Sequence, residues 1–330
     1  MKTFFKIISI LTSVFFILTI LLSYGISTSK FNNKIIYEIE KKLPNSKVYF
    51  NDTTISLDLF SLSLRAKINN PKIEIDNQDL SIKSFQIFTD LKSSFQKKYL
   101  LKKIIINFNN NEVSKLKNIS LIKNTNAFKK IKFIKGSGSG ELIIDQFQSN
   151  KLKIVFNGEF TNVIIGVSDD LPYIKKINGK INYSGEQILL SNVSGNFGEF
   201  DISSRELIYS FNRKLLSGVI NLKGRLNPTI NLKKILPKKI FRNFDKFLDV
   251  SGYLEIDANI KLKFNNDYTI IADDTTFNLN TKNLKFTHKN FKNVSFENIN
   301  SSFNFNNYGK INSKGTFEIN KKKNQFEITR

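Results

Sequence analysis

The segment Val250–Phe264 reads VSGYLEIDANIKLKF, and its alternation decides the fold. Each even-numbered position carries an apolar residue or glycine, whereas all odd-numbered positions except Tyr253 carry a polar or charged residue. Successive side chains of a β-strand point to opposite faces of the sheet, so this segment has one apolar face and one polar face. Such a pattern is typical of a half-buried antiparallel strand.

The same period of two recurs along the chain. It is clear in 152–160 and 216–226, and shorter runs lie in 55–68, 73–75 and 104–108. A chain that repeats this pattern so often is expected to be mostly β, with its strands paired antiparallel.

Two segments depart from the period of two. Between Asn33 and Leu43 the apolar residues recur at helical spacing, and Pro44 ends the pattern, which predicts one short helix. Helical spacing returns in a lysine-rich stretch, and we predict a helical insertion near 229–248 that Pro237 kinks or divides.

The N-terminus carries an uncharged apolar run from Ile7 to Tyr24, preceded by Lys2 and Lys6. A helix of this length measures about 27 Å, close to the hydrocarbon thickness of a bilayer. A cleaved signal peptide is the competing interpretation, but its apolar region is usually shorter and ends in a small-residue cleavage site. We therefore predict an uncleaved anchor, and under both interpretations the remainder of the chain lies outside the cytoplasm. The predicted membrane-spanning residues include Ile7, Leu11, Phe15, Leu18, Leu22 and Tyr24.

The charge balance of the chain is strongly basic, with 51 Lys and Arg against 28 Asp and Glu, a net charge of +23. This excess suggests polyanionic partners such as anionic lipid headgroups or nucleic acid. An alternative explanation of the positive charge is that Lys, Asn, Ile and Phe are abundant together because the coding sequence is AT-rich. Nucleic acid is not expected, because the chain has no recognition motif and export would separate it from that ligand.

The inventory of reactive residues argues against an enzyme. There is no cysteine, and His288 is the single histidine, so a thiol nucleophile, a disulfide and a multi-histidine metal site are excluded. The adjacent acids Asp273 and Asp274 would point to opposite faces of a strand, which does not suit paired acid–base chemistry. We expect no enzymatic activity, cofactor or metal.

A Gly/Ser-rich segment at 135–140 predicts a boundary inside the exported part. We therefore expect three sections: the anchor at 1–30, a helix with β-strands at 31–134, and a second β section at 135–330.

The order of these features resembles the AsmA-like family of envelope proteins, which includes the YhdP-type and TamB-type members. The resemblance begins with the anchor, the short helix, Asn70–Ile75 and Leu101–Ile106. It continues, similar to the central region of YhdP-type members, through Leu171–Ile181, Ser194–Gly198 and Leu222–Pro228. It covers most of the chain but rests on pattern, since no catalytic signature is involved.

The resemblance implies an elongated antiparallel sheet curled into a groove, anchored in the bacterial inner membrane by a single span with most of the chain in the periplasm. Along such a groove, phospholipid acyl chains move between the inner and outer membranes. The implied partners are membrane lipids, including anionic ones, and envelope proteins. Members of this type are usually several times longer, so a fragment, a short paralogue or one part of an assembly is expected. The alternation selects as groove-lining candidates Leu152, Ile154, Phe156, Leu216, Ile220, Leu222, Leu254, Ile256, Ile260, Leu262 and Phe264.

A structural hypothesis competes with the groove. The same alternation can bury an ordinary β-sandwich core, which would make the protein a non-transporting scaffold or assembly factor of the envelope. A sandwich predicts that a second sheet covers the apolar face, whereas a groove predicts that the face stays uncovered.

Overall fold

The structure, a computed structural model, describes residues 12–14, 16–17, 19–20, 22–42, 45–96, 100–118, 133–145, 152–166, 173–226, 247–267, 269–288, 290–306 and 310–329. The chain divides into two units. The N-terminal unit comprises Met1–Ser120 with Gly138–Gly158, and the C-terminal unit comprises Leu121–Ser137 with Glu159–Arg330. In the described residues the fold is mostly β, built from a large antiparallel sheet that is not closed, so the predicted β class is confirmed.

In the N-terminal unit, one run of paired strands is β1–β3–β4–β6–β7, and β2 and β5 extend the pairing from the first part of β6. Its elements are β1 (Ile26–Thr28), α2 (Asn32–Lys42), β2 (Ser46–Tyr49), β3 (Thr53–Asp58), β4 (Ser63–Asn69), β5 (Lys72–Ile75), β6 (Gln78–Asp90), α3 (Leu91–Phe95), β7 (Leu101–Glu112) and α4 (Val113–Asn118).

Helix α2 confirms the short helix predicted after the apolar N-terminus, and it helps to close a small core. Ile39 packs from α2 against buried Val48 and Ile73 of β2 and β5. The start of the helix is held by Asn32, whose side chain accepts a hydrogen bond from the Thr53 hydroxyl at 3.0 Å. The N-terminal unit therefore has a conventional core in which a helix covers part of the sheet.

The predicted anchor falls mostly outside the described residues, which do not include Ile7, Leu11, Phe15 or Leu18. Residues 22–24 are helical, and Leu22 and Tyr24 are 40% and 82% exposed. Strand β1, which pairs with β3, follows within the section predicted as anchor. Within the described part of the chain, no helix is both long enough and apolar enough to cross a membrane.

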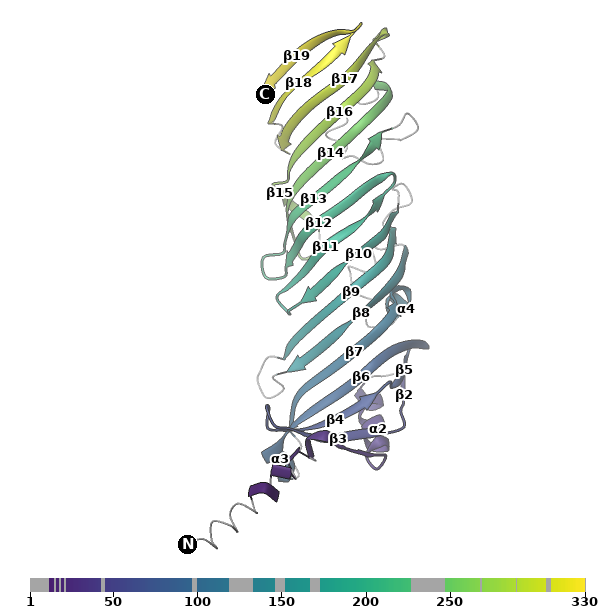
Figure 1. Cartoon of the computed structure of the whole chain (residues 1–330), viewed down its shortest axis with the longest axis vertical. Helices are drawn as coiled ribbons and strands as arrows, with labels where there is room; N and C mark the ends of the chain where they lie inside the picture. The colour runs from purple at the N-terminus through teal and green to yellow at the C-terminus, as the bar shows by residue number, and fades with distance from the viewer. Residues whose placement is uncertain are drawn as a thin grey trace. The chain divides into compact units, whose positions relative to one another are not determined.

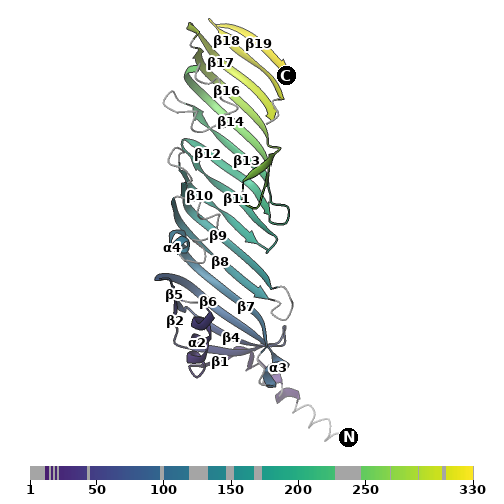
Figure 2. The same cartoon turned by 180° about the vertical axis from the view of Figure 1, so that it is seen from behind.

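In the C-terminal unit, β9 pairs with β10, and the pairing continues antiparallel in the order β10–β11–β12–β13–β14–β16–β17–β18–β19. Figures 1 and 2 show these strands side by side in one layer, with the short β15 beside the end of β14. The strands are β10 (Ile174–Tyr183), β11 (Gln187–Phe197), β12 (Phe200–Ser210), β13 (Leu215–Leu226), β14 (Phe247–Phe264), β15 (Ile270–Asp273), β16 (Thr276–His288), β17 (Phe291–Asn306), β18 (Ile311–Ile319) and β19 (Lys322–Thr329); β8 (Phe133–Asp145) and β9 (Lys153–Gly166) each contribute to both units.

Residues with a left-handed backbone interrupt these long strands. Gly252 of β14 has φ +133°, and a Cβ placed there would lie 2.6 Å from Cα of Leu284 on β16. Register shifts between β14 and β16 flank this glycine, which marks a β-bulge where two backbones approach closely.

One asparagine arrangement recurs at two bulges. The Asn162 N–H donates to Oδ1 of Asn178 at 2.9 Å, and Asn178 Nδ2 donates to the carbonyl of Lys176 at 2.8 Å. In the second copy, the Asn283 N–H donates to Oδ1 of Asn300 at 3.1 Å, and Asn300 Nδ2 donates to the Asn298 carbonyl at 2.8 Å. Asn162, Lys176, Asn283 and Asn298 all have φ near +50°. Asparagine, at three of these four positions, tolerates this conformation better than most residues. The asparagine side chain thus bonds backbone groups on both strands at the bulge.

Two expectations require correction, and a third lies mostly outside the described residues. The Gly/Ser-rich segment at 135–140 lies inside strand β8 and is not a linker, although one division between the two units, between Ser137 and Gly138, does fall within it. The predicted helical insertion lies outside the described residues except for Phe247 and Leu248, which begin strand β14. Leu152 precedes β9 instead of forming part of it. At 135–140 the local composition suggested a break, whereas pairing with neighbouring strands keeps the segment in a strand.

Candidate functional site

One face of the C-terminal sheet gathers apolar side chains from neighbouring strands. The register pairs Leu216 with Leu262 and Leu222 with Ile256 across β13 and β14. Because residues directly opposite each other in a ladder lie on the same face, these side chains form one surface. We define the apolar face as Leu216, Ile220, Leu222 and Leu226 of β13; Leu254, Ile256, Ile260, Leu262 and Phe264 of β14; Phe277, Leu279, Leu284 and Phe286 of β16; and Phe296, Ile299, Phe303 and Phe305 of β17.

The bulge at Asn283 keeps this face continuous. On β16 the apolar positions are odd-numbered before the bulge, as at Leu279, and even-numbered after it, as at Leu284. Leu284 packs against the cluster that contains Leu254, so it lies on the apolar face although its parity differs. The inserted residue thus offsets the change of parity in the sequence.

The apolar face is only partly covered. The buried cluster consists of Phe200, Leu226, Leu254 and Ile256, and Phe200 is fully buried with its ring over Gly224. The other members of the face on β13, β14, β16 and β17 are half-buried, with the exception of Ile299, which is 6% exposed. Inward-facing residues of a β-sandwich lose nearly all contact with water, and in the part of the chain that the structure describes no second sheet lies over these strands.

Aromatic rings extend the apolar face toward β19. Phe277 stacks on Phe305 and Phe286 on Phe296, each with a centroid distance of 5.0 Å. Further ring contacts link Phe296 to Phe317, Phe317 to Phe326 and Phe326 to Phe303 at about 6 Å. Strict alternation does not predict this group, because the bulges at positions 283 and 298 interrupt it. Asparagine within an alternating run is nevertheless a usable signal of a bulge.

The opposite face of the same strands is polar. Asn221, Lys223 and Arg225 project there from β13, and the odd-numbered residues of β14 lie beside them. Lys285 and Glu297 form an ion pair across β16 and β17 at 2.7 Å, and this lysine holds the pKa of the Glu297 carboxyl below its usual value. The sheet therefore has one wettable face and one apolar face.

Eight of the predicted groove-lining residues are thus brought together, all of them on β13 and β14 of the C-terminal unit. Ile154 and Phe156 belong to the N-terminal unit, where the Phe156 ring lies over Gly140 and Gly158. Leu152 is 55% exposed outside the strand.

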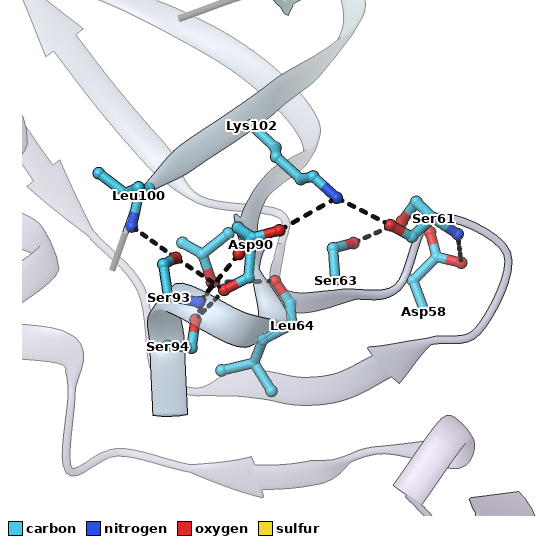
Figure 3. Close-up of polar contacts among 10 residues, drawn as sticks. Asp58, Ser61, Ser63, Leu64, Asp90, Ser93, Ser94, Leu100 and Lys102 are labelled. Carbon is cyan, nitrogen blue, oxygen red and sulfur yellow. Dashed lines mark hydrogen bonds and ion pairs between the residues drawn. The ribbon is translucent and has the colours of Figure 1, made fainter. Parts of the chain in front are cut away.

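A polar network surrounds Asp90 in the N-terminal unit (Figure 3). Asp90 caps helix α3, since its carboxylate accepts a hydrogen bond from the Ser93 N–H at 2.9 Å, and Lys102 lies 3.4 Å from the same carboxylate. The Ser93 hydrogen bond, followed by Lys102, lowers the pKa of Asp90. Lys102 also donates to the Ser61 carbonyl at 3.0 Å. These bonds fix the chain where α3 and the turn after β3 meet β7, which is a structural role.

Acidic and histidine side chains do not gather into a site that could hold a metal ion in the described part of the chain. Comparison with protein-family models, with curated proteins and with solved structures gave no match.

Proposed function

We propose that the protein is a membrane-anchored, non-enzymatic periplasmic protein whose apolar face carries phospholipid acyl chains between the inner and outer membranes. The N-terminal section at 1–30 would hold it in the inner membrane, with the two units in the periplasm. The observation that supports this function best is the row of half-buried apolar side chains on one face of β13, β14, β16 and β17, because the opposite face of the same strands is polar.

The free energy of burying apolar surface favours an acyl chain as the group that covers the apolar face. Removing a CH₂ group from water is worth about 0.8 kcal/mol, so a fully shielded lipid tail gains well over 10 kcal/mol. A single layer shields one side of the tail and therefore supplies about half of this free energy. A tail that slides from strand to strand keeps this contact, which lowers the barrier to leaving a bilayer.

The scaffold hypothesis predicts instead that the side chains of the apolar face are fully buried. A closed core would require Leu216, Ile220 and Leu262 to be as buried as Leu254, which is 6% exposed. All three are half-buried, and this difference favours an open binding face over a closed core.

Site-specific photo-crosslinking in living cells tests the proposed function. A photoreactive residue replaces Leu222 or Ile260 on the apolar face, and Lys223 or Asn259 serves as the matched neighbour on the polar face. We expect phospholipid adducts at the first pair only. Equal labelling at all four positions, or labelling at none, contradicts lipid binding by this face.

A further inference from the structure

The β12–β13 turn and the adjoining ends of β13, β14 and β15 surround a basic pocket of about 730 Å³ in the C-terminal unit. Four cationic residues line it, namely Arg213, Lys214, Lys261 and Lys263, whereas Asp274 is its one acidic lining residue. Lys261 and Lys263 lie on the polar face of β14, and Phe264 is the one pocket-lining residue that also belongs to the apolar face.

The β12–β13 turn and strand β14 build this pocket. The Phe264 N–H donates to the carbonyl of Lys214 at 2.9 Å, which ties the turn to the end of β14. Lys263 is paired with Leu215 on β13 and with Ala272 on β15, so the short β15 forms the opposite wall. The following turn is held by Asn265, whose Oδ1 accepts hydrogen bonds from backbone N–H groups at 2.8 and 2.9 Å.

The charge of the pocket is poorly compensated. Arg213, Lys261 and Lys263 form no ion pair or hydrogen bond through their side chains in the part of the chain that is described, and Lys214 donates to the Asn266 side chain, which is neutral. Like charges that line one pocket repel each other, and an anion that enters the pocket relieves this repulsion. Guanidinium and ammonium groups together are suited to bind the oxygens of a phosphate group.

Phe264 connects the pocket with the apolar face. It lines the pocket, and its ring contacts Tyr209 at a centroid distance of 6.1 Å. Tyr209 packs edge-on against Phe211, and Phe211 against Tyr183, at 5.2 and 5.9 Å. An aromatic rim therefore stands at the same strand ends as the cationic side chains, and an amphipathic ligand could contact both.

We propose that this pocket binds the phosphate headgroup of an anionic phospholipid while its acyl chains pass the aromatic rim onto the apolar face. This inference rests on the proposed function and adds a headgroup preference to it. The pocket would select lipids with a net negative charge over zwitterionic ones, since a zwitterionic headgroup adds a cation to a site that already has a surplus of four to one.

Lipid binding to the full-length chain tests this preference. Fluorescent phosphatidylglycerol and phosphatidylcholine with identical acyl chains are titrated in mixed micelles of a neutral detergent, and glycerol phosphate is the headgroup-only probe. The pocket variant combines Arg213→Glu with Lys263→Glu. The matched control combines Lys282→Glu with Lys314→Glu, because these exposed lysines project from β16 and β18 outside the pocket and the net charge changes equally. Far-UV circular dichroism checks that both variants keep the β fold.

We expect the unaltered chain to bind phosphatidylglycerol about 10-fold more tightly than phosphatidylcholine, and the pocket variant to lose this preference while the control keeps it. If both lipids bind alike to the unaltered chain, or if the two double variants lose equal affinity, the headgroup pocket is refuted but the acyl-binding face is not. If glycerol phosphate binds as tightly as phosphatidylglycerol, the pocket is a site for free phosphate esters and the lipid proposal is overturned. If neither lipid binds, the proposed function itself fails.

Discussion

Replacement of Ile260 by glutamine distinguishes an open apolar face from a closed core. Ile260 is half-buried on β14, and its cross-strand partner on β13 is Gly218, which has no side chain to cover it. Asn259, its exposed neighbour on the polar face, provides the matched control Asn259→Gln.

The expected magnitude follows from the burial of the two positions. Full burial of an isoleucine side chain is worth about 1.5–3 kcal/mol, so a half-buried one contributes about 1 kcal/mol. On an open face the new amide stays hydrated, and Ile260→Gln should lower the free energy of unfolding by about 1 kcal/mol. In a closed core the amide would also lose its hydrogen bonds to water, which adds about 1–3 kcal/mol to the lost transfer free energy of the entire side chain.

The assay is urea unfolding of the lipid-free chain followed by far-UV circular dichroism. Asn259→Gln should change the free energy of unfolding by less than about 0.5 kcal/mol, because it exchanges one exposed amide for another. A loss above about 3 kcal/mol for Ile260→Gln, with an unchanged control, would refute the open face, because only a covered position can cost so much.

Three further expectations concern the bulges and the polar network. Gly252→Ala should lower the free energy of unfolding in urea by more than about 2 kcal/mol, because φ is +133° and the new methyl would meet Leu284 Cα at 2.6 Å. In the control Gly198→Ala nothing lies within 4 Å of the added Cβ, so the loss should be about 1 kcal/mol. Equal losses for the two variants would contradict the close approach of the backbones at Gly252. Asn300→Ala removes the acceptor of the Asn283 N–H and should lower the free energy of unfolding by about 1 kcal/mol in the same assay. Asn304→Ala on the same strand should be nearly neutral. Similar losses for both variants would rule out that the Asn300 side chain stabilises the bulge. The pKa of Asp90 is lowered in the folded state, so its carboxylate stabilises the fold above the unfolded pKa of about 3.9, and this contribution is lost as the pH falls through the folded pKa. Asp90→Asn should therefore lower the melting temperature at pH 7 but progressively less as the pH approaches 2, and a difference that does not depend on pH would argue against this linkage.

The period of two was sufficient to predict the central part of the fold. In β13 and β14 the alternation runs with an unbroken register from Leu215 and Lys263 to Leu226 and Gly252, so parity alone assigned each side chain to a face. Helix α2 was equally predictable, since its apolar spacing agrees with its position against β2. Local pattern and tertiary structure agree in both places.

The remainder depends on pairing between strands that local sequence does not specify. The bulge at Asn283 reverses the parity of β16, which concealed the aromatic side chains that follow. The Gly/Ser-rich segment at 135–140 lies in β8 although glycine usually weakens a strand, because a neighbouring backbone approaches there: a Cβ at Gly136 would lie 2.6 Å from Val163 Cα. The basic pocket combines turn residues at 212–214 with strand residues about fifty positions later, so no local motif signals it.

A spin label beside the apolar face provides the most direct test of the central claim, that acyl chains cover side chains left uncovered by protein. The chain has no cysteine, so Leu262→Cys and Asn259→Cys place single labels on the apolar and polar faces of β14, the second outside the basic pocket. On addition of phospholipid, the label at 262 should become more accessible to oxygen and less accessible to a water-soluble nickel complex, while the label at 259 should not change. If the label at 262 keeps its accessibility to both reagents, or if both labels respond alike, the apolar face does not bind lipid.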